Sequence, residues 1–383
     1  MGICKYDNFN NQSGYFCNII GCPQNNIEKN LETNSLFNGK LRSLYKKDTN
    51  EELTKENLEK NLSSGSYLGI SDYNNLMNQK ILNYIESHKL NYQDFIPTPL
   101  DTYKSKPIKY NNGNIYHGNW NIEGEMEGYG IYLIKVQNLV IEGIWKKGNI
   151  IYGRIFFPNG DLYEGFLQNY YPHGKGTMFF ANKDIYKGDF INGEMSGIGI
   201  FTYADKSYFS GKIKNGLFNG EGIMKWINGN EYHGNFLDSF ISGNGEIFNN
   251  IIGEKYIGTF EKNEFNGNGT YSYKNGDIYQ GNFEYGIKKG KGIFKRHDKV
   301  EFDVIWDDDL PNGNGVVTYN NNKLNGFWRN GNIIRKDIKK ENENIFNGID
   351  LNIKPIKRSL YPGTLPHLNT YDSQCVMKTE WSL

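Results

Sequence analysis

The first residues of the chain carry two groups that could accept lipid. The chain begins Met-Gly-Ile-Cys, so removal of the methionine would give Gly2 the free amine that N-myristoylation acylates. One myristoyl chain binds a membrane only marginally, and stable anchoring needs a second signal. Lys5 and Asp7 are the only charges in residues 1–27, so no basic patch supplies that signal, but palmitoylation of Cys4 would. We therefore expect acylation at Gly2 and Cys4.

An alternative interpretation of this start stays open. The sixth residue of a myristoylated chain is usually Ser or Thr, and here it is Tyr6. The alternative is an ordinary Met-Gly start with a cysteine nearby by chance.

The residue types that most often carry out catalysis are scattered along the chain. Catalysis needs a nucleophile, a base and an orienting group close together, or a metal site. The sequence has no Gly-x-Ser-x-Gly, HExxH or phosphate-loop motif, and no helical pattern follows its Gly-x-Gly pairs, as a dinucleotide site would require. The spacing of Cys17 and Cys22 is too wide for a CxxC zinc knuckle. The six histidines are His88, His117, His173, His233, His297 and His367. We expect no catalytic residues, no metal and no cofactor, and therefore no enzyme.

The composition of the chain indicates which kinds of partner it can bind and in which cellular compartment it works. The 43 basic residues are balanced by 43 acidic ones, so the chain has no overall electrostatic attraction to nucleic acid. No apolar run is long enough for a membrane-spanning helix, and no apolar segment follows the start as in a secretory signal. Four cysteines in 383 residues make no disulfide framework. These features favour a protein of the reducing cytoplasm that binds no nucleic acid.

Glycine divides the chain into three parts. Of the 45 glycines, 37 lie in residues 108–331, 6 before them and 2 after. Within that middle part an aromatic or apolar residue, one spacer and a glycine recur, with Val304 in place of the glycine in one unit, and these positions are 22 to 25 residues apart. A period of that length indicates a repeat architecture of about nine units. The pairs with tyrosine are Tyr116 and Gly118, Tyr163 and Gly165, Tyr186 and Gly188, Tyr232 and Gly234, Tyr256 and Gly258, and Tyr279 and Gly281.

Each repeat has the alternation of two β-strands. A large apolar residue follows two positions after the glycine, as in Trp120, Phe190, Phe236, Phe260 and Phe283, so the three residues share one face of a strand. Asn-Gly pairs between repeats, such as 112–113 and 228–229, predict type I′ hairpin turns. Because glycine has no Cβ, we expect aromatic rings to lie over the glycines and to form the core.

The repeat resembles a known family. Tyr-x-Gly-x-(Trp/Phe) followed by Gly-x-Gly, as in Tyr186–Phe190 and 197–199, is similar to the MORN (membrane occupation and recognition nexus) repeat. The resemblance implies an elongated, mainly β, single-sheet solenoid of antiparallel hairpins, often dimeric, that serves as a scaffold at membranes and the cytoskeleton. The repeat core residues it implies are the tyrosine, glycine and large apolar positions named above.

The flanking regions differ from the ribbon. Residues 1–50 are polar, Asn-rich and expected to be partly disordered. Residues 51–107 contain two predicted helices, 51–62 and 73–90, and a linker; the second has one apolar face, and we expect it to pack on the first hairpins and cap the sheet edge. Residues 332–383 are expected to form an extended tail.

Four functions fit these features, one of them a regulatory subunit of a separate enzyme. The first is a non-catalytic scaffold, tethered by Gly2 and Cys4 to the cytoplasmic face of a membrane, that presents the ribbon to protein partners. The second is a module that binds phosphoinositide headgroups directly, although the outward positions show no continuous basic stripe. The third is a structural component of the axoneme or cytoskeleton without lipid contact. A single sheet with aromatics on one face also needs that face covered, by its own twist or by another chain, which makes a homodimer a reasonable expectation.

Overall fold

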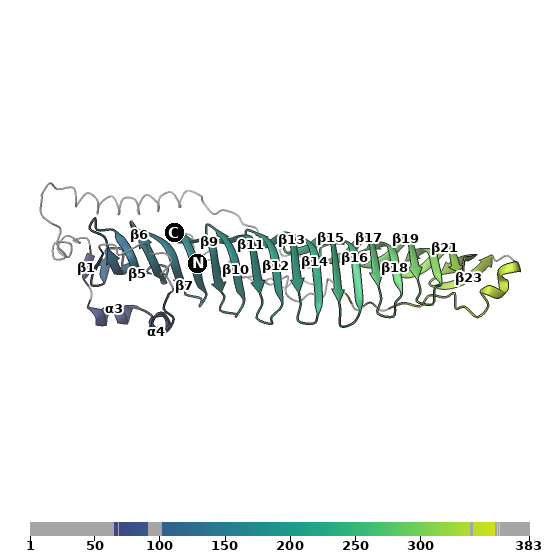
Figure 1. Cartoon of the computed structure of the whole chain (residues 1–383), viewed down its shortest axis with the longest axis horizontal. Coiled ribbons are helices and arrows are strands. Elements are labelled where there is room, and N and C mark those ends of the chain that lie inside the picture. Colours follow the sequence, from purple (N-terminus) through teal and green to yellow (C-terminus); the bar gives the residue numbers. More distant parts are fainter. Residues whose placement is uncertain are drawn as a thin grey trace, which may run out of the picture.

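A computed structural model of the chain describes residues 65–67, 69–90, 102–337, 340–356, 358 and 360. The candidate acylation sites Gly2 and Cys4, residues 1–50 and the predicted helix 51–62 lie outside the described residues. Within them the chain forms one long, twisted ribbon of strands that run across its width (Figure 1).

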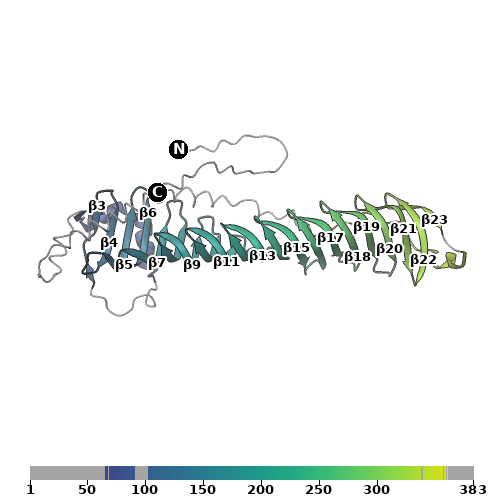
Figure 2. The ribbon, with the colours of Figure 1, turned by 90° about the horizontal axis from the view of Figure 1, so that it is seen from above.

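The ribbon is a single 23-stranded sheet within the described residues. β1 pairs with β3, β2 and β3 both pair with β4, and from β4 to β23 each strand pairs antiparallel with the next. Seen from above, the twist turns successive strands steadily along the ribbon (Figure 2). The predicted fold class, a mainly β solenoid of hairpins in one sheet, is confirmed.

The strands are β1 Gly65–Tyr67, β2 Tyr103–Lys104, β3 Ile108–Tyr110, β4 Ile115–Trp120, β5 Met126–Ile134, β6 Leu139–Lys146, β7 Asn149–Phe156, β8 Leu162–Gln168, β9 Tyr171–Phe179, β10 Ile185–Ile191, β11 Glu194–Thr202, β12 Tyr208–Lys214, β13 Leu217–Lys225, β14 Asn230–Leu237, β15 Phe240–Asn249, β16 Glu254–Glu261, β17 Glu264–Ser272, β18 Ile278–Glu284, β19 Ile287–Lys295, β20 Glu301–Asp307, β21 Leu310–Tyr319, β22 Asn322–Arg329 and β23 Asn332–Asp337. The last strand therefore lies beyond residue 331.

One face of the sheet, here called the inner face, holds the aromatic core. Gly188 of β10 stands directly opposite Gly199 of β11, and the ring of Tyr186 lies over both. A Cβ on Gly199 would come within 2.3 Å of the ring atom Cε2 of Tyr186, so only glycine fits there. Tyr186 also meets Phe190 edge to face, with ring centroids 5.2 Å apart. Repeated along the ribbon, such contacts make a continuous aromatic ladder within one layer.

The other core tyrosines have the same surroundings. Tyr116, Tyr163, Tyr186, Tyr232, Tyr256 and Tyr279 are all 0% exposed. Trp120, Phe190, Phe236, Phe260 and Phe283 are buried beside them, and Gly118, Gly165, Gly188, Gly234, Gly258 and Gly281 lie beneath the rings. Because these rings are buried within one chain, a second chain is not needed to cover them. The structure thus removes the physical reason for expecting a homodimer.

The turns between repeats differ from the predicted type I′ geometry. Type I′ needs a positive φ at both central residues, but at 112–113 only Gly113 has one, with φ 85°. Tyr110 N–H donates to the carbonyl of Asn114, which closes a three-residue loop of the kind that ends in a glycine bulge. The turns with two positive φ values lie at the opposite edge, within repeats, as at Asn192 (49°) and Gly193 (89°). The prediction of type I′ turns between repeats is wrong because these loops are one residue longer.

Two short helices precede the ribbon where one was expected over 73–90. They are α3, Ile70–Leu76, and α4, Gln79–Ser87. The break falls at Met77, whose backbone is extended, and Asn78 then caps α4 by accepting a hydrogen bond from the backbone N–H of Lys80 at 2.9 Å. A 3₁₀ helix, η1 (Lys340–Ile345), follows the last strand. Neither α3 nor α4 nor η1 has the length and hydrophobicity to span a membrane, and no other helix occurs in the part of the chain described.

Candidate binding surfaces on the two faces of the ribbon

The outer face, opposite the aromatic core, is covered by α3 and α4 at its first strands. The apolar side chains of the helices, Tyr73, Met77 and Ile85, are buried against outward-facing residues of the ribbon. The ribbon residues in this cluster are Ile115, Leu133, Val140 and Phe156. Their positions alternate with the core residues along each strand, so the helices dock on the outer face and not over the aromatic ladder.

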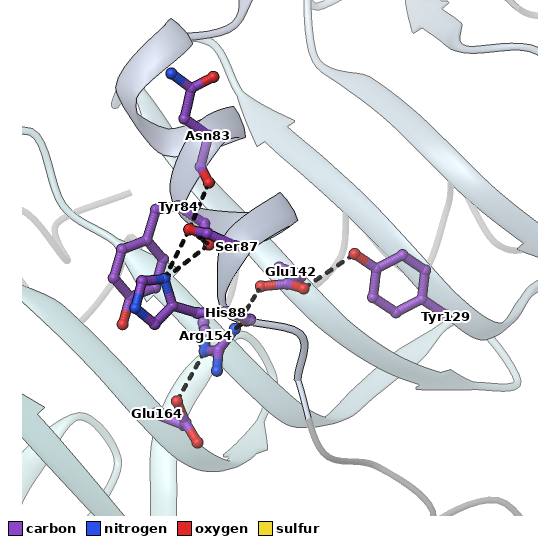
Figure 3. A network of polar contacts seen from close by, with 8 residues as sticks. All are labelled: Asn83, Tyr84, Ser87, His88, Tyr129, Glu142, Arg154 and Glu164. Atoms are coloured by element: carbon purple, nitrogen blue, oxygen red, sulfur yellow. Dashed lines mark hydrogen bonds and ion pairs between the residues drawn. The ribbon is translucent and has the colours of Figure 1, made fainter.

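A partly buried ion-pair network joins the end of α4 to the ribbon (Figure 3). Arg154 of β7 donates from Nε to Glu164 Oε2 at 2.7 Å and from Nη1 to Glu142 Oε2 at 3.3 Å. The same Nη1 donates to the backbone carbonyl of His88, the C-cap of α4. The guanidinium also lies 5.7 Å from the ring centroid of Tyr84. One arginine thus links two neighbouring strands to the helix end.

Glu142 is the buried member of this network. Its residue is 1% exposed, and burial raises the pKa of its carboxyl. The hydroxyl of Tyr129 donates to its Oε1 at 2.9 Å, and this bond and Arg154 both act to lower the pKa. Removal of Arg154 would leave a buried carboxylate without its cation, which is costly.

Beyond the helices an apolar run continues along the outer face, where no helix of the described residues covers it. We name it the open apolar run; it consists of Phe166, Phe179, Ile185, Ile198 and Ile200 on β8 to β11. Phe179 pairs across the sheet with Leu162, which packs against the helix cluster, and with Ile185 on the other side. Ile198 is 63% exposed and Ile200 47%. The run is therefore a direct extension of a surface that already binds two helices.

The inner face is covered at its far end by the segment that follows η1. This segment, residues 346–360, runs back along the last strands (Figure 1). Its apolar side chains Phe346, Leu351, Ile353 and Leu360 are buried in the aromatic core. Unlike the strands, its described residues have no ladder of backbone bonds to the ribbon. Side chains and single hydrogen bonds hold it in place.

The hydrogen bonds of this segment are spread along its length. Trp328 Nε1 donates to the carbonyl of Leu351 at 2.9 Å, and Ile353 N–H donates to the carbonyl of Gly331 at 2.8 Å. Arg358 is 4% exposed, donates from Nη2 to Asp309 Oδ2 at 2.9 Å, and lies over the ring of Phe283. The segment is thus anchored by apolar side chains and one buried arginine.

Lys288 lies in an aromatic cage within electrostatic reach of that arginine. Its Nζ is 4.8 to 5.8 Å from four ring centroids, those of Tyr273, Tyr279, Phe294 and Trp306, and the residue is 2% exposed. Burial lowers the pKa of Lys288 to about 7; Asp309 opposes this shift and Arg358 adds to it. Two cations thus share the neighbourhood of Asp309.

The candidate residues predicted from the sequence differ from those that stand out on the surfaces. The repeat core residues form one continuous ladder. Because they are buried, they stabilise the ribbon and are not themselves a binding surface. Arg154 and Lys288 were not singled out. The sequence pattern could have identified Lys288, since it is a lysine at an inward repeat position that is otherwise apolar. No group of His, Cys, Asp or Glu in the described parts of the chain could hold a metal ion.

The repeats match a family model directly. The model of the MORN repeat matches seven stretches: residues 116–135, 163–185, 186–208, 209–231, 256–278, 279–299 and 305–323. The ribbon is built of MORN repeats. Between the matched stretches, the strand pairs at 139–156 and 230–249 continue the MORN ribbon without interruption. MORN repeats are in general non-enzymatic modules that serve as scaffolds and mediate interactions with proteins or lipids.

Two solved structures illustrate distant likenesses. The TCP10 domain of Danio rerio CPAP is 12% identical, with 47% of this chain and 84% of that chain covered and a TM-score of 0.31. BamB from Moraxella catarrhalis is 10% identical, with 63% and 92% covered and a TM-score of 0.14. Scores this low carry no argument about function. No curated protein matches the chain.

Proposed function

We propose that this MORN-repeat protein is a non-catalytic scaffold that binds protein partners on the outer face of its ribbon. The observation that supports this most is the open apolar run, because it continues a surface on which α3 and α4 already dock. Exposed apolar patches that adjoin an existing interface are typical of protein interaction sites. Its neighbours on the same face are Lys187, Asp189 and Lys212, which supply the polar rim of such a site.

The test is quantitative affinity purification from the native host. Ile198→Lys with Ile200→Lys puts two charges into the open apolar run, and we expect stoichiometric partners of the wild type to be lost. The matched control is Asn268→Lys with Thr270→Lys, which adds the same charges to the same face on β17, a strand whose own outward residues are polar. Equal recovery of partners with the double-isoleucine variant would contradict the proposal.

We further propose that acylation of Gly2 and Cys4 tethers this scaffold to the cytoplasmic face of a membrane. The support is the Met-Gly-Ile-Cys start of the sequence, which offers both lipid signals within four residues. Gly2→Ala should release the protein from the membrane fraction, and Cys4→Ser should weaken its retention. Membrane association that Gly2→Ala leaves unchanged would refute the tether.

Two alternative functions, phosphoinositide binding and a structural role in the cytoskeleton, predict different experimental results. If the ribbon itself bound phosphoinositide headgroups, unacylated protein would float with liposomes that contain them; the mixed charge of the outer face leads us to expect no flotation. If the protein were a structural component of the cytoskeleton or cilium, the tagged protein would follow those structures and ignore Gly2→Ala. Light scattering tests the homodimer; with the aromatic rings buried within one chain, we expect a monomer.

A further inference from the structure

The position of Lys288 is apolar in the other hairpins. Phe283 pairs in register with Lys288 after the bulge of its hairpin. The nine residues at the equivalent position are Met126, Ile150, Pro172, Met195, Phe218, Ile241, Phe265, Pro311 and Ile333. A charge at one inner position out of ten is costly for the core, since burial of an amine disfavours its charged form. The lysine therefore calls for a role other than packing.

The residues around Lys288 form a site with a defined chemistry. The amine of Lys288 lies over the rings of Tyr279 and Trp306, the ring of Phe283 is next to this cage, and Asp309 supplies a carboxylate. In the structure Arg358 fills this site, with its guanidinium over Phe283 and bonded to Asp309. An arginine is a good occupant, because a guanidinium bonds a carboxylate and stacks on an aromatic ring at once.

The residues that carry Arg358 are held by side chains and isolated hydrogen bonds, without a strand ladder. No strand pairing joins the described residues of 346–360 to the ribbon, and the hydrogen bonds are single ones, such as Leu360 N–H to the hydroxyl of Tyr271 at 3.3 Å. Lys288 weakens the site further for its occupant, because two cations share the neighbourhood of one carboxylate. The apolar anchors are Leu351, Ile353 and Leu360, so the pattern is Leu-x-Ile-x₄-Arg-x-Leu.

We propose that the inner face around Lys288 and Asp309 is a recognition site for an extended protein segment with a buried arginine, and that residues 346–360 occupy it until such a segment displaces them. The proposal rests on the scaffold role, but it concerns the inner face and a different partner segment. A failure here leaves the outer-face proposal intact, because the two sites share no residue.

The test uses full-length protein and a labelled synthetic peptide with the sequence of residues 344–360. In the wild type the attached segment competes at a high effective concentration, so we expect weak binding of the peptide. In the full-length variant Arg358→Gln the attached segment loses its anchor, and we expect the wild-type peptide to bind at least tenfold more tightly than it binds the wild-type chain. A peptide that itself carries Arg358→Gln should not bind either chain.

Two further variants keep the test decisive. Asp309→Asn combined with Arg358→Gln should lose the peptide, because the carboxylate that receives the arginine is gone. Lys288→Met combined with Arg358→Gln should bind the peptide more tightly than Arg358→Gln alone, because the second cation near Asp309 is gone. Hydrogen exchange in β4 to β16 serves as the control for folding and should be unchanged in all variants. Equal peptide affinity of the wild-type and Arg358→Gln chains, or equal affinity with and without Asp309, would overturn the proposal.

Discussion

The phenol of Tyr186 donates a hydrogen bond to the backbone carbonyl of Asp189, three residues later in the same strand, at 2.9 Å. Asp189 has no register partner on β11, because the register shifts between Gly188 and Phe190. The tyrosine hydroxyl therefore bonds the backbone where the ladder is interrupted. The same bond runs from Tyr116, Tyr163, Tyr232, Tyr256 and Tyr279 to the carbonyl three residues later. This explains why the position favours tyrosine over phenylalanine.

Tyr186→Phe should destabilise its hairpin by about 1 kcal/mol, the usual net contribution of one hydrogen bond. Local hydrogen exchange is the right measurement, because a linear ribbon can open in parts. The ribbon offers its own control in Phe209, which occupies the tyrosine position without a hydroxyl. Phe209→Tyr should leave stability unchanged or raise it. If Tyr186→Phe had no effect, the bond at the interrupted ladder would not contribute to stability.

Gly199→Ala should cost about 2–3 kcal/mol, because the new Cβ would overlap the ring of Tyr186 and a packed core cannot absorb it. The control is Gly253→Ala, where a new Cβ would meet no atom within 4 Å and only the positive φ of 73° opposes alanine. That strain costs about 1 kcal/mol. Thermal unfolding and local exchange compare the two variants. If Gly253→Ala lost more stability than Gly199→Ala, the contact between ring and glycine would not explain why glycine recurs in every repeat at this position.

Arg154→Met should free α4 from the ribbon. It leaves Glu142 buried without its cation, and breaking such a pair costs about 3–5 kcal/mol. Amides of Gln79–Ser87 should then exchange far faster than in the wild type. The control is Lys225→Met, which breaks an exposed pair with Glu231 and should change stability by at most about 1 kcal/mol. Full exchange of α4 within seconds in the wild type would show that the helices do not dock.

The pH dependence of stability should reveal the caged amine of Lys288. Burial lowers the pKa of Lys288 to about 7 in the folded state, below its ordinary value of 10.5 in the unfolded chain. Between these values the unfolded chain binds a proton that the folded chain does not, so stability rises with pH from about 7 toward 9.5. Below about pH 7 both states are protonated and the full penalty is present.

Lys288→Met should therefore be more stable than the wild type at pH 7, and the difference should shrink as the pH rises to 9.5. The comparison stops there because the buried tyrosines, whose pKa values burial raises, begin to ionise in the unfolded chain near pH 10 and lower stability in both proteins. Denaturant titrations at several pH values measure the difference. Parallel pH profiles for the two proteins would rule out the depressed pKa.

The alternation of a few residues between the two faces of a strand was enough to predict the architecture. Tyr186, Gly188 and Phe190 share one face only in a strand, and their return every 23 residues or so leaves a hairpin ribbon as the simple solution. The reason for the first glycine of each Gly-x-Gly pair was not predicted. Gly197 has a φ of 119° and lies in the bulge, whereas Gly199 lies under the ring.

The surfaces were harder to predict than the core. Which outward residues are covered depends on where α3 and α4 dock. Phe156 is covered and Ile198 is exposed, but the sequence around each of them does not show this difference. The position of Arg358 against Asp309 depends on the return of the segment 346–360 across 49 residues of sequence. Such long-range contacts leave no periodic pattern, so only three-dimensional structure brings them together.

The most direct test of the scaffold proposal is contact at the open apolar run. A photoreactive amino acid placed at Phe166 or Ile198 should cross-link the full-length protein to a discrete partner in the native host. The same amino acid at Asn268, on the same face of a strand whose own outward residues are polar, should not. The scaffold proposal predicts cross-links at 166 and 198 alone. Cross-links at 268 with none at 166 or 198 would contradict it.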